Sequence, residues 1–163
     1  MSISFNADEV FEMAEEIERQ AAKFYSEVSK NAPTDEMRKF FIELSAMEAR
    51  HLKIFADMRK QLSEDEKTGT TYDPENEAVL YLKTMADAKG WEGRISPAQK
   101  FTGKEPMKKV IEIALNAEKE SVVFYYGLRS MVSERAGREK IEQIILEELS
   151  HIRTLLEYLK KMS

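Results

Sequence analysis

An internal repeat at an offset of 100 residues is the feature that most narrows the possible folds of this 163-residue chain. Two distant stretches align without a gap, although identity between them is otherwise low, and we interpret them as the products of an old duplication. The repeat predicts two structurally equivalent units related by a pseudo-two-fold axis, and one site that takes equivalent residues from both. The matched positions include Glu18 and Glu118, Phe24 and Phe124, Tyr25 and Tyr125, Arg38 and Arg138, Glu48 and Glu148, and His51 and His151.

Each unit contains two long segments whose apolar residues recur with the spacing of an amphipathic α-helix. Pro33 ends the first segment, and Pro106 suits the first turn of the third. Only a few residues, about 31–34 and 133–137, link the two segments of each unit, and such short links make antiparallel neighbours. The four segments cover about residues 7–30, 35–62, 106–131 and 138–161.

A long connection, residues 63–105, separates the two hairpins. It carries most of the glycines and prolines and a candidate short helix over residues 73–89. Because a connection of this length can cross a whole bundle, we expect one all-α domain over residues 1–163, a ferritin-like four-helix bundle made of two antiparallel helical hairpins. Its expected parts are hairpin 1 at about 7–62, the long crossover at 63–105 that contains the short helix, and hairpin 2 at about 106–162.

Composition argues against several classes of function. A net charge of −5 is unfavourable for a nucleic-acid-binding protein that relies on a basic surface. No apolar run approaches the roughly 20 residues of a membrane span, and residues 1–6 lack the basic flank and apolar segment of a secretory signal. We therefore expect a cytoplasmic protein with no nucleic-acid or membrane partner. Because the chain has no cysteine, any metal must be held by His, Asp or Glu.

Both histidines of the chain lie in a Glu-x-x-His motif, from Glu48 to His51 and from Glu148 to His151. Residues three apart share one face of a helix, so both side chains of each motif can reach one ion. From composition, two such motifs would arise by chance with odds of roughly 2%. Each motif also interrupts an apolar face of its helix. The pair therefore indicates a metal site inside the bundle.

Glu18 and Glu118 lie on or beside apolar faces as well. Ionised carboxylates on such faces are costly unless they are paired or bound to metal. At about 1.5 Å of rise per residue, Glu18 stands level with Glu48, and Glu118 stands level with Glu148 to within about one turn. Two divalent ions would cancel the four negative charges, and mixed carboxylate and imidazole ligands suit iron or manganese. The predicted metal ligands are Glu18, Glu48, His51, Glu118, Glu148 and His151.

These motifs resemble the rubrerythrin-like branch of the ferritin-like di-iron carboxylate proteins. The resemblance covers the four long helices and leaves the crossover poorly matched. It implies two iron ions bridged by Glu48 and Glu148. It also implies one terminal carboxylate and one histidine on each ion, with Tyr25 and Tyr125 as hydrogen-bond donors to ligand carboxylates. The residues that carry the resemblance are Glu18 with Phe24 and Tyr25, Glu48 with His51, Glu118 with Phe124 and Tyr125, and Glu148 with His151.

The chain departs from the pattern of rubrerythrins in two respects. Rubrerythrins proper carry a cysteine-ligated rubredoxin-type domain as the entry point for electrons, whereas this chain has no cysteine. A separate electron-donor protein is therefore expected. Rubrerythrins also place an extra carboxylate three residues after the glutamate of the third helix, where this chain has Ser121. The carboxylate associated with redox-linked ligand exchange is thus missing.

The resemblance implies an oxidoreductase, a peroxidase whose iron(II) reacts with hydrogen peroxide or dioxygen and is then restored by the external donor. It also implies a homodimer. Other functions stay open at this point. The chain could bind iron for oxidation, storage or sensing, or hold manganese and disproportionate peroxide without a reductant. It could also hydroxylate an organic substrate, or serve as a metal-free bundle for partner proteins.

Simpler roles also stay open for individual residues. Glu18 and Glu118 could face solvent at the edge of their helices, and Tyr25 and Tyr125 could be ordinary packing residues. Glu147 is most simply part of a solvated face, although it could reach a neighbouring imidazole.

Overall fold

Four long α-helices and no strands make up the part of the chain that the computed structural model describes, residues 7–64 and 102–162. The predicted helix boundaries agree with these four helices to within two residues. The predicted short helix over 73–89 and most of the predicted crossover lie outside the described residues. The helices are α1 (Ala7–Lys30), α2 (Asp35–Lys60), α5 (Met107–Met131) and α6 (Arg138–Lys161).

Local sequence signals explain where the helices begin. The Thr34 side chain accepts a hydrogen bond from the backbone N–H of Met37 at 3.2 Å and caps α2. Pro106 lies immediately before α5 in an extended conformation, one residue earlier than predicted. Gly137 precedes α6 with a φ of 102°, a left-handed conformation that favours glycine. A Cβ atom at this position would also lie 3.1 Å from the side chain of Met58.

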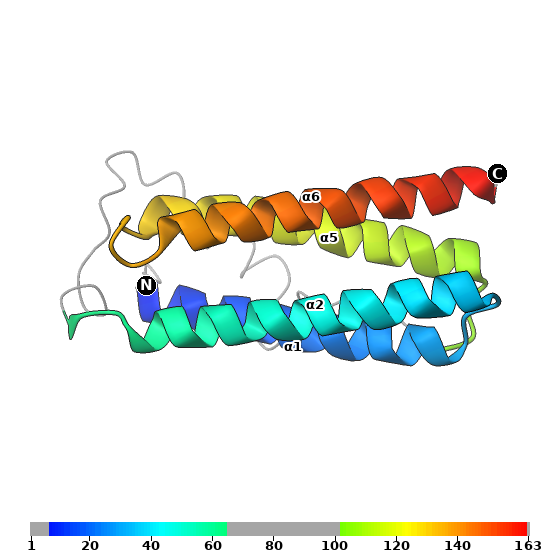
Figure 1. Ribbon diagram of the computed structural model, residues 1–163, viewed down its shortest axis with the longest axis horizontal. Coiled ribbons are helices and arrows are strands. Elements are labelled where there is room, and N and C mark those ends of the chain that lie inside the picture. Colours follow the sequence, from blue (N-terminus) through cyan, green and yellow to red (C-terminus); the bar gives the residue numbers. More distant parts are fainter. Residues whose placement is uncertain (1–6, 65–101, 163) are drawn as a thin grey trace, which may run out of the picture.

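The helices form two antiparallel hairpins, α1 with α2 and α5 with α6, that pack against each other lengthwise (Figure 1). Across the interface between the hairpins, α1 contacts α5 and α2 contacts α6. The end of α2 and the start of α5 lie at opposite ends of the bundle (Figure 1). None of the described helices is long and apolar enough to cross a membrane.

The core consists of two apolar clusters with a polar layer between them. On α1, Ile17 belongs to the first apolar cluster and Phe24 to the second, while Glu18 lies in the polar layer. The other three helices repeat this order of apolar, polar and apolar residues. The first apolar cluster includes Phe11, Phe55, Tyr125, Leu128 and Ile144, and the second includes Tyr25, Phe41, Leu44, Ile111 and Leu155. Burial of these large side chains stabilises the bundle and encloses the polar layer on both sides.

Candidate metal centre

The polar layer contains all six predicted ligands. They come from every helix of the bundle, and none is more than 4% exposed. Glu18 and Glu118 are buried, so the structure does not support the solvent-facing alternative for either residue. Among the described residues, every buried glutamate and histidine lies in this layer. Its members are Glu18 on α1, Glu48 and His51 on α2, Glu118 on α5, and Glu148 and His151 on α6.

The ligand atoms of the layer fall into two overlapping groups. Within each group, one ligand atom from every residue lies within 4.8 Å of the others. Glu48 and Glu148 belong to both groups and therefore lie between two candidate metal positions. The first group is Glu18, Glu48, His51 and Glu148, and the second is Glu48, Glu118, Glu148 and His151.

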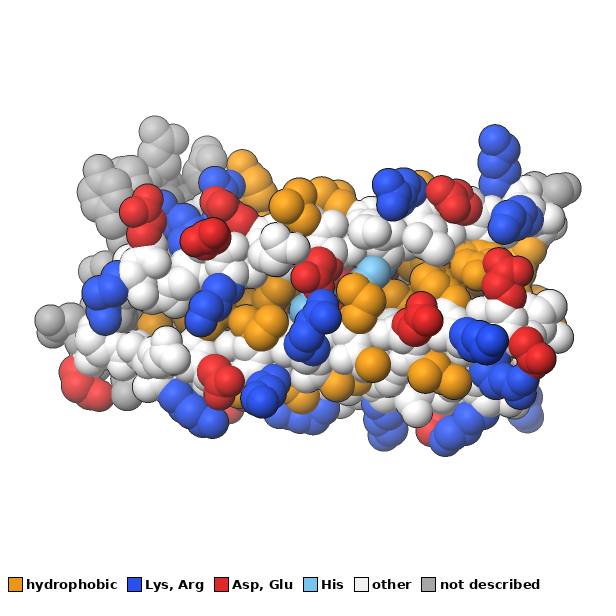
Figure 2. Space-filling view, viewed as in Figure 1, with side chains coloured by type: hydrophobic (Ala, Val, Ile, Leu, Met, Phe, Trp, Pro, Cys, Tyr) orange, Lys and Arg blue, Asp and Glu red, His pale blue; other side chains and the backbone are white. Residues whose placement is uncertain are grey.

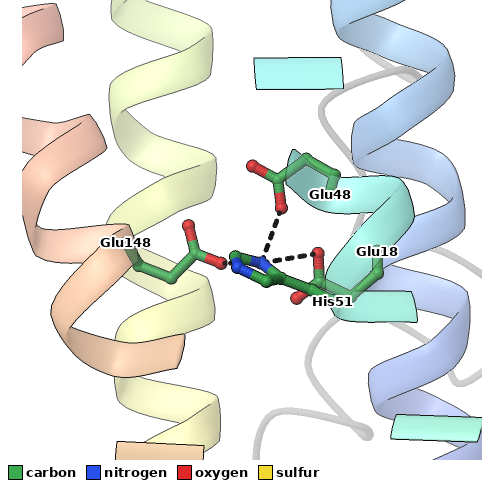
Figure 3. Close-up of side chains that lie close together, drawn as sticks. All are labelled: Glu18, Glu48, His51 and Glu148. Carbon is green, nitrogen blue, oxygen red and sulfur yellow. Dashed lines mark ion pairs between the residues drawn. The ribbon is translucent and has the colours of Figure 1, made fainter. Parts of the chain in front are cut away.

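Both histidines turn their Nδ1 atoms toward the carboxylates. His51 Nδ1 lies 3.0 Å from Glu148 Oε1, 3.4 Å from Glu48 Oε2 and 3.7 Å from Glu18 Oε2 (Figure 3). In the other half, His151 Nδ1 lies 2.9 Å from Glu148 Oε2 and 3.4 Å from Glu48 Oε1. On the inner side of the layer, both histidines thus present Nδ1 to the two shared carboxylates, and Glu148 is the nearer carboxylate to each.

The ionisation of the layer is set by burial and by its own charges. Burial, reinforced by the negative charges of Glu48 and Glu148, raises the pKa of the carboxyl groups of Glu18 and Glu118. For Glu48 and Glu148 themselves, burial also acts to raise the pKa. Close polar contacts with the two histidine rings outweigh it and lower the pKa of both carboxyl groups.

The pKa of each histidine is raised. Burial opposes the charged ring, but close polar contacts with the surrounding carboxylates outweigh burial. Without metal, these shifts favour carboxylate–imidazolium pairs between Glu48, Glu148 and the two histidines, and they favour the protonated form of Glu18 and Glu118. Divalent cations can replace these protons, because metal ligands must be deprotonated to bind.

Several atoms of the layer lack the hydrogen-bond partner that a buried polar atom normally has. They are Glu48 Oε1, Glu148 Oε1 and His51 Nδ1 within the cluster, and His151 Nε2 on its outer side. A buried polar atom without a partner costs about 1–3 kcal/mol. The three inner atoms are an imidazole nitrogen and two carboxylate oxygens, which are donor types suited to iron or manganese. The residues present therefore fit a metal centre.

Two buried tyrosines hydrogen-bond to the terminal carboxyl groups, those of Glu18 and Glu118. Tyr25 Oη donates to Glu118 Oε1, and Tyr125 Oη donates to Glu18 Oε1. Each tyrosine therefore links its own hairpin to the opposite one. Burial and the nearby carboxylates raise the pKa of both phenols, which keeps them protonated as donors. The sequence predicted donors to ligand carboxylates, and the structure adds that the bonds cross between the hairpins.

Glu147 also contacts the centre, although it is not among the predicted ligands. Its Oε2 atom lies 2.8 Å from Nε2 of His51, and the guanidinium of Arg50 binds the same carboxylate. Burial acts to raise the pKa of Glu147, but hydrogen bonds from His51 and Gln143 outweigh it and the pKa is lowered. From the sequence, a contact between Glu147 and a neighbouring imidazole was left open as an alternative, and no role was predicted for Arg50. Its counterpart in the 100-residue repeat is Met47, but because few positions are kept in both halves, this mismatch does not single out Glu147 in the sequence.

The fold and the buried layer together define a four-helix bundle with a carboxylate and histidine centre, and the comparisons with known proteins agree. The Rubrerythrin family model matches residues 9–160, and the chain belongs to the rubrerythrin family. The family implies a di-iron site, which the glutamate and histidine cluster fits. These findings confirm the family resemblance seen in the sequence.

A solved structure from Thermotoga maritima, described as a ferritin-like diiron-carboxylate protein, matches this chain with a TM-score of 0.74. The match covers 100% of both chains at 24% identity. This likeness confirms the predicted fold class, an all-α ferritin-like bundle. A search of curated proteins found no match.

Proposed function

We propose that this protein is a di-iron oxidoreductase that reduces hydrogen peroxide, or reacts with dioxygen, at the expense of iron(II) and an external electron donor. The observation that carries the proposal is the pair of overlapping ligand groups, in which Glu48 and Glu148 lie between two positions. Each position has one further carboxylate and one imidazole, and such mixed ligands suit iron. Family membership supports the same proposal.

The six buried residues would hold two iron ions. Glu48 and Glu148 would be shared, and each position would add its own terminal carboxylate and histidine. When bound, the pair of iron(II) ions supplies one electron each, and hydrogen peroxide accepts both electrons with two protons to form two molecules of water. We place the source of replacement electrons on a separate protein, because these 163 residues contain no cysteine for a rubredoxin-type iron centre.

The rest of the chain orients and encloses this centre. Tyr25 and Tyr125 hold the two terminal carboxyl groups in place from the opposite hairpins. The first and second apolar clusters exclude water above and below the layer. The ring of Phe55 packs on Tyr125 with centroids 5.0 Å apart, and Phe41 stacks on Tyr25 at 6.0 Å, which fixes the directions of the hydroxyl groups.

A cytoplasmic homodimer is part of the same proposal. Exposed apolar side chains on the outer faces of α5 and α6 support self-association, above all Tyr126 and Leu146, which are each 60% exposed. Figure 2 shows hydrophobic side chains at the surface along the upper edge of the bundle. Their burial in a dimer would be favourable.

The test is a rapid-mixing experiment on protein loaded anaerobically with iron(II). Oxidation faster with hydrogen peroxide than with dioxygen, followed by re-reduction with an added donor over many cycles, is the expected result. Iron that oxidises and is then followed by the uptake of many more ions would instead favour storage. Peroxide breakdown by manganese-loaded protein without any reductant would favour a catalase-like activity. Either of these results would contradict the peroxidase proposal.

A further inference from the structure

The two halves of the centre differ at the outer nitrogen of their histidines. His51 Nε2 lies 2.8 Å from Glu147 Oε2. His151 Nε2 is buried and has no hydrogen-bond partner. The inner Nδ1 atoms of both rings face the shared carboxylates of Glu48 and Glu148, although only His151 Nδ1 is hydrogen-bonded, to Glu148 Oε2 at 2.9 Å. The duplication has therefore left the outer nitrogens of the two histidines in different surroundings.

A small polar network creates this difference. Glu147 is half-buried, with 24% of its side chain exposed, and Arg50 of α2 binds it from the solvent side. Gln143 donates to Glu147 Oε1 at 3.4 Å, one helical turn earlier on α6. Figure 2 shows the histidine side chains at the seam between α2 and α6, with acidic and basic side chains beside them.

The network has no counterpart in the other half of the repeat. At the offset of 100 residues, Met47 corresponds to Glu147, and its thioether is at best a weak acceptor. Ser150 corresponds to Arg50, so the basic side chain is missing as well. The third residue of the network, Gln143, corresponds to Glu43. All three residues of the network therefore differ between the two halves.

A carboxylate behind a metal-binding imidazole has a known physical effect. It accepts the outer N–H, fixes the tautomer and the ring orientation, and makes the inner nitrogen a stronger ligand. His51 can bind an ion through Nδ1 while its Nε2–H is satisfied by Glu147. For His151 in the same tautomer, the outer N–H would stay buried without an acceptor. Loss of such partners typically reduces metal affinity by about 10–100-fold.

We propose that Glu147 is a positioning residue that makes the two metal positions unequal, so that the position containing His51 binds a divalent ion more tightly than the position containing His151. The inference rests on the proposed metal centre. It adds an order of loading and loss, in which the position containing His51 is filled first and emptied last. We expect the two affinities to differ by about 10–100-fold.

The test uses cobalt(II), which is not oxidised during a titration, with calorimetry and visible absorption as readouts. Each position is isolated by removal of the histidine of the other, as His151→Ala or His51→Ala. Glu147→Met, which copies the residue of the other half, is then added to each background. We expect it to weaken binding by about 10–100-fold in the His151→Ala protein and to change binding by less than about threefold in the His51→Ala protein. Glu147→Gln, which keeps an acceptor oxygen, should recover part of the affinity.

A gain-of-function variant keeps the inference testable if either histidine variant fails to fold. Met47→Glu, made in the otherwise unchanged chain, should tighten the weaker of the two binding steps and leave the tighter step unchanged. Equal effects of Glu147→Met in both backgrounds, or no effect of Met47→Glu, would overturn the inference while leaving the metal centre intact. An unaltered protein that binds no cobalt(II) would overturn both the inference and the proposed function.

Discussion

Loss of the Tyr25 hydroxyl should destabilise the metal-free bundle, because this group donates a buried hydrogen bond between the two hairpins. Tyr25→Phe keeps the aromatic ring and its stacking on Phe41, so the apolar burial is unchanged. The substitution leaves Glu118 Oε1 without its donor in a layer that excludes water. A buried polar atom left without a partner costs about 1–3 kcal/mol. We expect a loss of about 2 kcal/mol in the free energy of unfolding.

For a chain of this length, 1 kcal/mol corresponds to about 2–4 °C in Tm, so Tyr25→Phe should lower the Tm by about 4–8 °C. Thermal unfolding followed by circular dichroism on metal-free protein measures the change. Tyr126→Phe is the matched control, because the Tyr126 side chain is 60% exposed, its hydroxyl lies outside the centre, and the substitution keeps the apolar ring that the proposed dimer would bury. That control should alter stability by no more than about 0.5 kcal/mol. A Tyr25→Phe protein as stable as the control would refute the structural role assigned to this hydrogen bond.

Two further predictions concern protons and metal. The pKa values of both histidines and both terminal carboxyl groups are raised in the folded protein above ordinary values of 6.5 and 4.5, so the folded state binds more protons than the unfolded state. The histidines therefore contribute their full share of the free energy of unfolding below pH 6.5, and this contribution is lost as the pH rises toward their raised pKa values. In a pH series, the Tm of the metal-free protein should accordingly fall between pH 6 and pH 9. A flat series would contradict this charge balance. Iron(II) supplied anaerobically at about 100 times the Kd of the tighter position should add about 2.7 kcal/mol of stability at pH 7 through that position alone, and a chelator should reverse the gain. An unchanged Tm with iron(II) would argue against a preformed site.

The sequence predicted much of the fold because two independent periodicities coincide in it. The apolar spacing located the four helices, and the 100-residue repeat paired them into two equivalent hairpins. The repeat alone would also admit Glu12 and Glu112, but the repeat combined with position on an apolar helix face selected Glu18 and Glu118 from the many glutamates of the chain. Helical rise then placed these residues at the height of the Glu-x-x-His motifs.

Other features depend on how the hairpins pack, which no local pattern encodes. That Tyr25 bonds to Glu118, and Tyr125 to Glu18, follows from the approach of α1 to α5 across the bundle. The contact of Glu147 with His51 likewise depends on the rotation of α6 relative to α2. A glutamate on a partly solvated helix face gives no sign of such a partner until both helices are in place.

The central claim is that the six buried residues bind two metal ions, and anaerobic titration of metal-free protein with iron(II) tests it most directly. We predict that the unaltered chain takes up two ions and that the double variant Glu48→Ala with Glu148→Ala takes up neither, because both positions share these carboxylates. Glu157→Ala, a change at an exposed glutamate on the same helix as Glu148, should leave the uptake of two ions intact. Two ions retained by the double variant, or no uptake by the unaltered chain, would contradict the ligand assignment.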